Sequence, residues 1–466
     1  MTLRTTLDAG ATEDVVAVIE AAADAYEARR RRGAWHGRQP VHTAYVPADR
    51  FDAGTLAAWG VEAAGLLDRH LASPDDIAEV FGIDRAMAPE VRDRVAAKLA
   101  TEPVEDLRID FEDGYGERGD DVEDADARRA ALVIAGPGPP AFVGLRVKSF
   151  ADGRHRRALR TLDGFVTTLL DATDGALPDG FVITFPKIVA VAHVEAFAAL
   201  LDRLEHALGL PERSLVFEIQ IETTESVLGH AGRAPLPALV DAAAGRLVGA
   251  HFGVFDYTAA CGLPGDQQRL DHPACDFARH VMQVTLAGTG IRLADGSTNR
   301  TPVDDSTETV RAVWAHHAAL VRHSLTHGFY QGWDMHPSHL VSRFVAVHAF
   351  HLAHLDDTTA RLATWSATQG RGGHGGVGTG GAAETGGGSA AKTDDGSAGT
   401  GGDTGAGGAD APEDDAAGPS TGVVDEPATV RALLASLRRA VDCGAIDADD
   451  ACASAGIDRA TLDSAG

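Results

Sequence analysis

Eight short apolar segments between residues 42 and 333 constrain the fold of this chain more than any other feature. Each is rich in branched and aromatic residues, as buried parallel strands are. They cover residues 42–47, 107–111, 142–147, 181–185, 215–221, 247–252, 290–293 and 329–333. Helix-like stretches such as residues 192–208 and 307–327 separate most of them. This alternation predicts an α/β fold of the TIM type, a (β/α)8 barrel, in preference to an open doubly wound sheet. No Gly-x-Gly-x-x-Gly motif follows a strand, which removes the main argument for a dinucleotide-binding fold.

The chain divides into four regions by composition and periodicity. Residues 1–40 form an N-terminal extension with an amphipathic helix near residues 12–32. Residues 41–366 form the barrel, whose long first connection, residues 53–99, is expected to be a helical insertion over one end. Residues 367–427 consist largely of Gly, Ala, Thr, Ser and Asp, so we expect a disordered linker that cannot bury a core. Residues 428–466 are expected to be a short helical tail attached through that linker.

Composition excludes several classes of protein. The hydrophobic fraction of 44% fits a globular core, and no run of about eighteen apolar residues predicts a membrane span. Because the N-terminus shows no apolar signal core, we expect a cytoplasmic protein. A net charge of −27 argues against nucleic acid as a partner. The four cysteines show no Cys-x-x-Cys spacing, so we expect free thiols.

Two of the expected strands lead to carboxylates. The fifth, Phe217-Glu-Ile-Gln-Ile, ends at Glu222, and the sixth, Gly249-Ala-His-Phe-Gly-Val-Phe, leads to Asp256. Parallel strands deliver their C-terminal residues to one edge, where two acids can hold Mg²⁺ and leave its other positions to water and substrate. We therefore predict a metal site at Glu222 and Asp256. The alternative is that these acids are helix caps or ion pairs at the barrel rim.

Other charged residues stand at the ends of the remaining expected strands. They are Asp110, Glu112, Asp113, Arg146, Lys148, Lys187, Asp334 and His336. Lys148 follows Arg146 by two residues, so we expect both side chains on one face. So many charges would be costly in a barrel core but suit a solvated mouth around a metal and an anionic substrate. We interpret His336, in His-Pro-Ser, as a structural residue of the last loop.

The ordered motifs Asp-Phe-Glu-Asp, Leu-Arg-Val, Phe-Pro-Lys, Ile-Glu-Thr and Gly-x-x-Asp-Tyr precede Gly328-Phe-Tyr-Gln-Gly-Trp-Asp-Met-His-Pro-Ser338. Together they resemble the citrate lyase β-subunit-like and 2-oxo-acid aldolase family of the phosphoenolpyruvate/pyruvate barrel superfamily. The resemblance spans about residues 41–355. It implies that Glu222 and Asp256 ligate Mg²⁺, or Mn²⁺ in its place. It implies that Arg146 grips the carboxylate or oxo group of the substrate.

The resemblance also implies roles for three further residues and a reaction. Glu112 and Asp113 line the metal site through water, and Lys187 supports it. The implied enzyme is a Mg²⁺-dependent carbon–carbon lyase of the aldolase type. It would cleave or form a small oxo or hydroxy acid, or its acyl-CoA thioester, through a metal-stabilised enolate. A homo-oligomer is implied by the resemblance alone.

Departures from the family pattern leave alternatives open. Strand one lacks the family's arginine near Val41 and His42, and Phe329-Tyr-Gln-Gly-Trp333 lacks its aspartate and lysine, so we assign no CoA site. The catalytic base has three candidates, His36, His251 and Asp334. One alternative function is phosphoryl transfer to or from phosphoenolpyruvate and pyruvate. Another is a non-catalytic metal-binding barrel subunit.

Overall fold

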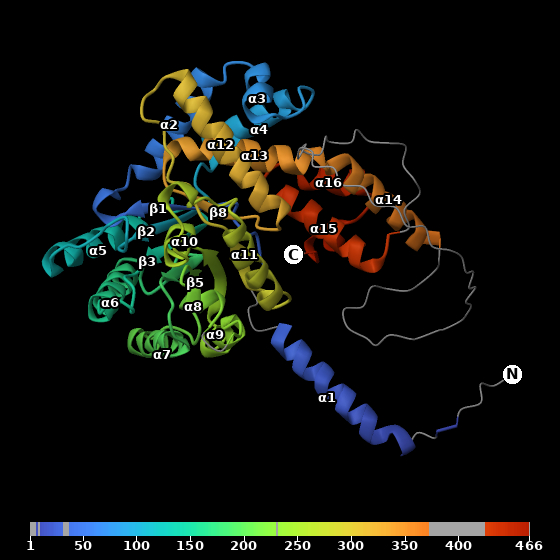
Figure 1. Ribbon diagram of the computed structural model, residues 1–466, viewed down its shortest axis with the longest axis horizontal. Coiled ribbons are helices and arrows are strands. Elements are labelled where there is room, and N and C mark those ends of the chain that lie inside the picture. Colours follow the sequence, from blue (N-terminus) through green and yellow to red (C-terminus); the bar gives the residue numbers. More distant parts are fainter. Residues whose placement is uncertain (1–5, 8–9, 31–36, 230–231, 372–424, 466) are drawn as a thin grey trace, which may run out of the picture.

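The computed structural model describes residues 6–7, 10–30, 37–229, 232–371 and 425–465 (Figure 1). Its centre is a single sheet of eight parallel strands in the order β7-β6-β5-β4-β3-β2-β1-β8. The strands are β1 His42–Pro47, β2 Asp106–Asp110, β3 Phe142–Arg146, β4 Phe181–Phe185, β5 Val216–Ile221, β6 Leu247–Phe252, β7 Arg292–Ala294 and β8 Gly332–Asp334. A parallel bridge joins Ala294, the last residue of β7, to Gln331, the residue before β8. The two edges of the sheet therefore meet, and the sheet is a nearly closed barrel. The predicted (β/α)8 barrel is confirmed.

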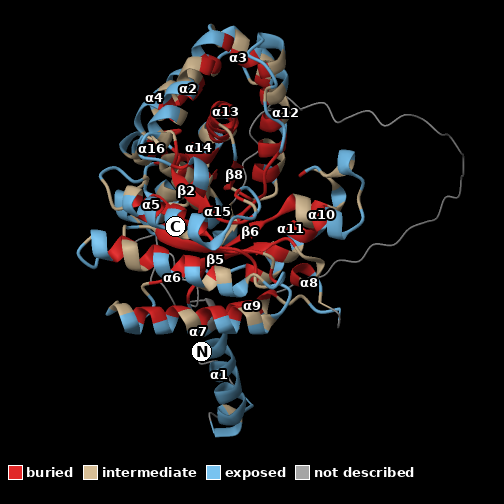
Figure 2. Ribbon diagram, turned by 90° about the vertical axis from the view of Figure 1, so that its left-hand side faces the viewer, coloured by how far each residue is buried: buried red, intermediate tan, exposed pale blue. Residues whose placement is uncertain are grey.

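Helices alternate with the strands and cover the outside of the barrel. They are α5 Asp120–Ile134, α6 His155–Ala172, α7 Val191–Leu208, α8 Thr224–Val227, α9 Leu236–Ala242, α10 Val254–Ala260, α11 Pro273–Leu286, α12 Thr307–Thr326, α13 Pro337–Ala353 and α14 Leu355–Arg371. Figure 2 shows α6, α7 and α9 with buried and exposed stripes, as amphipathic helices on a sheet have. No described helix combines the length and apolar character needed to cross a membrane.

The long connection after β1 consists of three helices. They are α2 Thr55–His70, α3 Pro74–Phe81 and α4 Ala88–Thr101. They lie against α12 and α13, and the guanidinium of Arg311 on α12 donates to Asp76 on α3 at 2.6 Å. The predicted helical insertion is therefore present and thickens the helical layer beside β8.

Both ends of the chain carry helices. The N-terminal helix α1 Glu13–Arg30 agrees with the prediction. The C-terminal helices are α15 Pro427–Asp442, α16 Ala448–Ala455 and α17 Arg459–Asp463. They lie against α13 and α14, with Leu434 and Leu437 buried and His348 Nε2 3.1 Å from the carbonyl oxygen of Cys443. The predicted helical tail is confirmed, and it packs against the barrel's helical layer. Residues 367–371 of the expected linker belong to α14, and residues 372–424 lie outside the described residues.

The interior of the barrel is unusually polar. TIM barrels mostly fill this space with branched apolar side chains, whereas here Arg108 of β2 donates to both oxygens of Glu218 of β5, at 3.0 and 3.1 Å. Thr184 also donates to Glu218, at 2.5 Å. Alternation places the apolar neighbours Leu107 and Ile219 on the opposite face, under the helices. The buried charges pair inside the barrel and support the charged groups nearer its mouth.

Candidate functional site

The structure brings together most of the charged residues predicted at the strand ends. Lys187, just after β4, is their common partner, because its Nζ lies 2.6 Å from Glu112 Oε1 and 2.7 Å from Asp113 Oδ2. Its distance to Asp256 Oδ2 is 3.7 Å. The backbone N–H of Lys187 donates to Glu222 Oε1 at 2.8 Å. One lysine therefore contacts all four carboxylates of the predicted site.

Of the two predicted metal ligands, Glu222 is more deeply buried than Asp256. It follows β5, and only 2% of its surface is exposed. Burial, and after it the negative charge of Asp256, raise the pKa of its carboxyl group to about 8. Lys187 and Arg146 oppose this shift but do not cancel it. The carboxyl group thus retains its proton near neutral pH unless another cation approaches.

Asp256 lies in the first turn of α10, beyond the end of β6, with its side chain 44% exposed. Burial raises the pKa of Asp256, and the negative charge of Asp113 adds to that effect. Burial also raises the pKa of Glu112. Hydrogen bonds with the side chains of Lys187 and Glu112 lower the pKa of Asp113. The mouth therefore holds an excess of negative charge.

The backbone of Lys187 has a φ angle of 51°, in the left-handed region that residues other than glycine seldom adopt. This conformation costs roughly 1–2 kcal/mol. It allows the backbone N–H to reach Glu222 while the ammonium group reaches Glu112 and Asp113.

Arg146, at the end of β3, is buried and oriented by Asp110. Its Nε and Nη2 donate to the two oxygens of Asp110 at 2.6 and 2.7 Å. Its Nη1 faces Gln220 at 3.4 Å and Glu112 at 3.6 Å, and the guanidinium lies 5.0 Å from the centre of the Tyr45 ring. Asp110, expected at the end of the second strand, lies opposite Arg146 in the register of β2 and β3 and orients its guanidinium.

Lys148 does not join this site, and the expectation that it shares a face with Arg146 is wrong. Its Nζ donates to the carbonyl oxygens of Phe111 at 2.6 Å and Gly116 at 3.1 Å, and pairs with Glu123 at 3.2 Å. Alternation fails here because β3 ends at Arg146. Lys148 instead fixes the loop that carries Glu112 and Asp113.

The candidates for a catalytic base are not free at the mouth. Trp333 Nε1, which can only donate, lies 3.1 Å from His251 Nδ1, so the ring proton is on Nε2, 2.9 Å from Glu218 Oε2. Asp334 points to the outer face of the barrel, where Arg343 of α13 donates to it at 2.9 Å. His36 lies outside the described residues. The loop role expected for His336 is confirmed, because its Nδ1 accepts from the Ser338 N–H at the start of α13.

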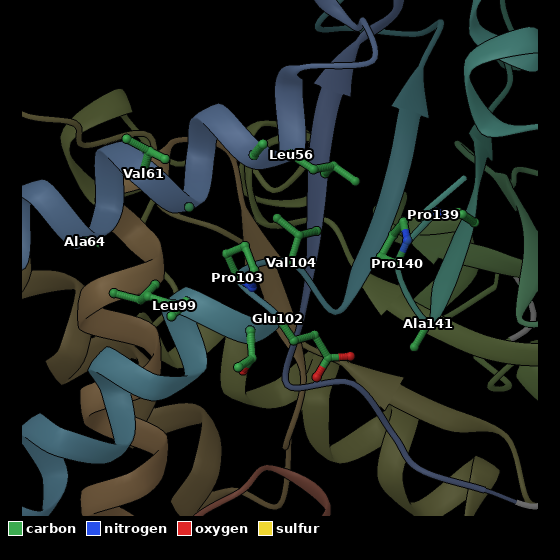
Figure 3. Close-up of a pocket in the computed structure, with 15 residues that line it drawn as sticks. Leu56, Val61, Ala64, Leu99, Glu102, Pro103, Val104, Pro139, Pro140 and Ala141 are labelled. Carbon is green, nitrogen blue, oxygen red and sulfur yellow. The ribbon is translucent and has the colours of Figure 1, made fainter. Parts of the chain in front are cut away.

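A cavity of about 510 Å³ lies away from this site (Figure 3). It is enclosed by α2, by the residues before β2 and by the residues before β3, and Leu56, Leu99, Pro103 and Pro139 line it. It therefore adjoins the N-terminal ends of two strands, opposite the charged mouth. Its lining is mostly apolar.

Comparison with solved structures found two kinds of enzyme with a related backbone. A citrate lyase from Burkholderia xenovorans LB400 is 17% identical over 73% of this chain and 84% of that one, with a TM-score of 0.49. Malate synthase from Haloferax volcanii, in its magnesium/glyoxylate complex, is 16% identical over 65% and 74% of the respective chains, with a TM-score of 0.45. At this distance neither likeness bears on function. No curated protein matches the chain. Residues 20–386 and 412–466 match the family described as "Domain of unknown function (DUF6986)", and the chain belongs to that family.

Proposed function

We propose that this protein is a Mg²⁺-dependent carbon–carbon lyase of the aldolase type. Its substrate would be a small oxo or hydroxy acid, or the acyl-CoA thioester of one. The observation that supports this most is the imbalance of charge at the mouth. Glu112, Asp113, Glu222 and Asp256 surround one ammonium group, that of Lys187. Arg146 is already paired with Asp110 and does not redress this imbalance.

The residues present fit a hard divalent cation. All the candidate ligand atoms are carboxylate oxygens, which Mg²⁺ prefers and Mn²⁺ accepts. Glu222 and Asp256 would hold the ion, and Glu112 and Asp113 would orient its water. Binding would displace the proton that burial keeps on Glu222. When bound, the ion polarises a substrate carbonyl and stabilises the charge of an enolate.

The protein's own groups would bind and orient the substrate. Arg146 presents its Nη1 N–H groups on the side of Gln220 and Glu112, where a carboxylate could be gripped. Asp110 holds the guanidinium in place through two hydrogen bonds. Lys187 keeps Glu112 and Asp113 on the inner side of the mouth. Residues 41–366 would form the catalytic unit.

Calorimetric titration tests the proposal. Metal-free protein is titrated with Mg²⁺ or Mn²⁺, with and without oxalate, which resembles the enolate of pyruvate. We expect oxalate binding to require metal and to be lost in the Glu222→Gln/Asp256→Asn double variant with its circular dichroism unchanged. Asp75→Asn/Glu90→Gln, which removes the same charge from exposed positions, should bind like the wild type.

Metal-dependent oxalate binding would justify a screen of oxo acids and acyl-CoA thioesters for cleavage. Absence of metal binding would overturn the proposal. Binding that survives in the Glu222→Gln/Asp256→Asn variant would place any metal elsewhere in the protein and would overturn it as well.

A further inference from the structure

A second cluster of metal-binding groups lies behind β8, on the outer face of the barrel. It consists of Asp334 of β8, His317 of α12 and His339 of α13, helices that lie side by side in Figure 1. These side chains are completely or almost completely buried, with exposures of 0–2%. One oxygen or nitrogen atom from each lies within 4.8 Å of the others. None of the three belongs to the mouth described above.

The hydrogen bond of His339 determines which ring nitrogen carries its proton. Nε2 lies 2.8 Å from the carbonyl oxygen of Arg300, which can only accept. The proton is therefore on Nε2, and Nδ1 presents a lone pair. Within the described part of the chain, this buried Nδ1 has no hydrogen-bond partner. Leaving such an acceptor unpaired costs about 1–3 kcal/mol.

His317 is oriented in the same way. Its Nδ1 lies 2.7 Å from the hydroxyl oxygen of Ser342, and that hydroxyl group donates to the carbonyl oxygen of His339 at 3.2 Å. In the tautomer with its proton on Nδ1, His317 donates to Ser342 Oγ while the Ser342 hydroxyl group donates to His339. The lone pair on His317 Nε2 then faces Asp334 Oδ1, 3.5 Å away. That separation is too long for an effective hydrogen bond.

Asp334 completes a set of three electron-pair donors. Arg343 donates to it at 2.9 Å, and His42 Nδ1 lies 2.9 Å from its Oδ2. The proton of His42 is on Nδ1, since Nε2 accepts from the backbone N–H of Glu105. These contacts hold the carboxylate with Oδ1, which also accepts from Arg343 Nη2, 3.5 Å from His317 Nε2. Two imidazole lone pairs and one carboxylate oxygen thus surround a buried point. The ring proton of each histidine is on its other nitrogen, directed away from this point.

We propose that His317 Nε2, His339 Nδ1 and Asp334 Oδ1 bind one divalent transition-metal ion of the zinc class, with water in its fourth position. Bonds of about 2.1 Å in a tetrahedral site place neighbouring ligand atoms roughly 3.4 Å apart, which agrees with the 3.5 Å between His317 Nε2 and Asp334 Oδ1. Both histidines donate their outer N–H to an oxygen atom, as metal-bound histidines generally do. The two imidazole nitrogens favour a transition-metal ion over a hard cation such as Mg²⁺.

The ion would have a structural role. It would join α12, α13 and β8, and through His339 it would hold Arg300 in the segment between β7 and α12. That segment follows β7 at the same end of the barrel as the charged mouth. Loss of the ion should therefore loosen residues 295–306 without removing any group from the mouth.

Metal analysis of the purified full-length protein tests this inference. After dialysis against metal-free buffer and incubation with Zn²⁺, we expect about one tightly bound zinc ion per chain. The His317→Gln/His339→Gln variant should lose it. Asp276→Asn/His323→Gln, which alters the other group of metal-binding side chains, at α11 and α12, should retain it. The Glu222→Gln/Asp256→Asn variant should also retain it, so this test is independent of the proposed function.

Two further measurements on the wild type cover the case of a variant that fails to fold. Co²⁺ in place of Zn²⁺ should give the intense visible absorption of a four-coordinate ion. Hydrogen exchange in residues 295–306 should be slower with Zn²⁺ than after chelation. Folded protein that binds no zinc would overturn the inference. Zinc that is retained without His317 and His339, or lost with Asp276 and His323, would overturn it too.

Discussion

Gly253 lies so close to Glu222 that a Cβ atom on it would stand 2.4 Å from both the Cβ and the Oε2 of Glu222. Its φ angle of −101° is open to any residue, so the requirement for glycine comes from space and not from backbone conformation. The end of β6 thus forms a wall against which the Glu222 carboxyl group rests. The direction of the Glu222 carboxyl group therefore depends on the absence of a side chain at residue 253.

The first prediction concerns this contact. Gly253→Ala should turn the Glu222 carboxyl group away and reduce metal-dependent oxalate binding at least about tenfold, while overpacking lowers the free energy of unfolding by roughly 1–3 kcal/mol. Calorimetry and urea denaturation measure the two effects. Gly164→Ala on α6, where a Cβ would meet no atom within 4 Å, is the matched control. Unchanged oxalate binding in Gly253→Ala would contradict the prediction.

The second prediction concerns pH. Burial raises the pKa of Glu222 from its ordinary value of 4.5 to about 8, so between these values the folded, metal-free chain holds a proton that the unfolded chain has lost. Its stabilising effect is complete below pH 4.5 and disappears as the pH rises through about 8. The free energy of unfolding should fall by up to about 1.4 kcal/mol per pH unit across this window.

Urea denaturation in the presence of a chelator, repeated at several pH values, measures this slope. Glu222→Gln cannot titrate and should flatten it, whereas Glu90→Gln, on the exposed side of α4, should not. Added Mg²⁺ should compete with the proton and also flatten the wild-type slope. Equal slopes in the wild type and Glu222→Gln would show that Glu222 does not carry the shift.

The third prediction concerns the polar interior. Glu218→Gln should lower the free energy of unfolding by about 3–5 kcal/mol, because it removes one of the two buried carboxylates that pair with the Arg108 guanidinium, the other being that of Asp106. Thermal and urea denaturation measure the loss. Asp75→Asn, which breaks an ion pair whose side chains are 70% and 75% exposed, should change stability by less than about 1 kcal/mol. Similar losses in the two variants would contradict a supporting role for the interior pair.

The fourth prediction concerns the C-terminal helices. Leu437→Ala should destabilise the whole protein by about 2–5 kcal/mol, since Leu437 is 1% exposed in the core shared by α15 with α13 and α14. Unfolding should remain a single transition. Val284→Ala on α11, at a residue 79% exposed, should have almost no effect. A separate low-temperature transition in Leu437→Ala would indicate that the tail folds apart from the barrel.

Much of the barrel follows from local sequence pattern. The strands expected at residues 42–47, 181–185 and 247–252 have those bounds in the structure. The last two strands begin two and three residues later than expected and end one residue later, at Arg292–Ala294 and Gly332–Asp334. Strands of three residues show too little alternation for their ends to be located. The meeting of Glu112, Lys187, Glu222 and Asp256 could also be predicted, because parallel strands bring their C-terminal ends together.

Which side chains contact each other was decided only by the tertiary structure. The sequence placed Lys148 beside Arg146, but its ammonium is captured by the carbonyl oxygens of Phe111 and Gly116. His251 is a candidate base in the sequence, but Trp333, 82 residues away, donates a hydrogen bond to its Nδ1. His317 and His339 showed no shared pattern in the sequence, yet they converge on Asp334. Periodicity along a chain records which face of an element is buried. Which buried groups meet, and which nitrogen carries a proton, depends on contacts between residues far apart in the sequence.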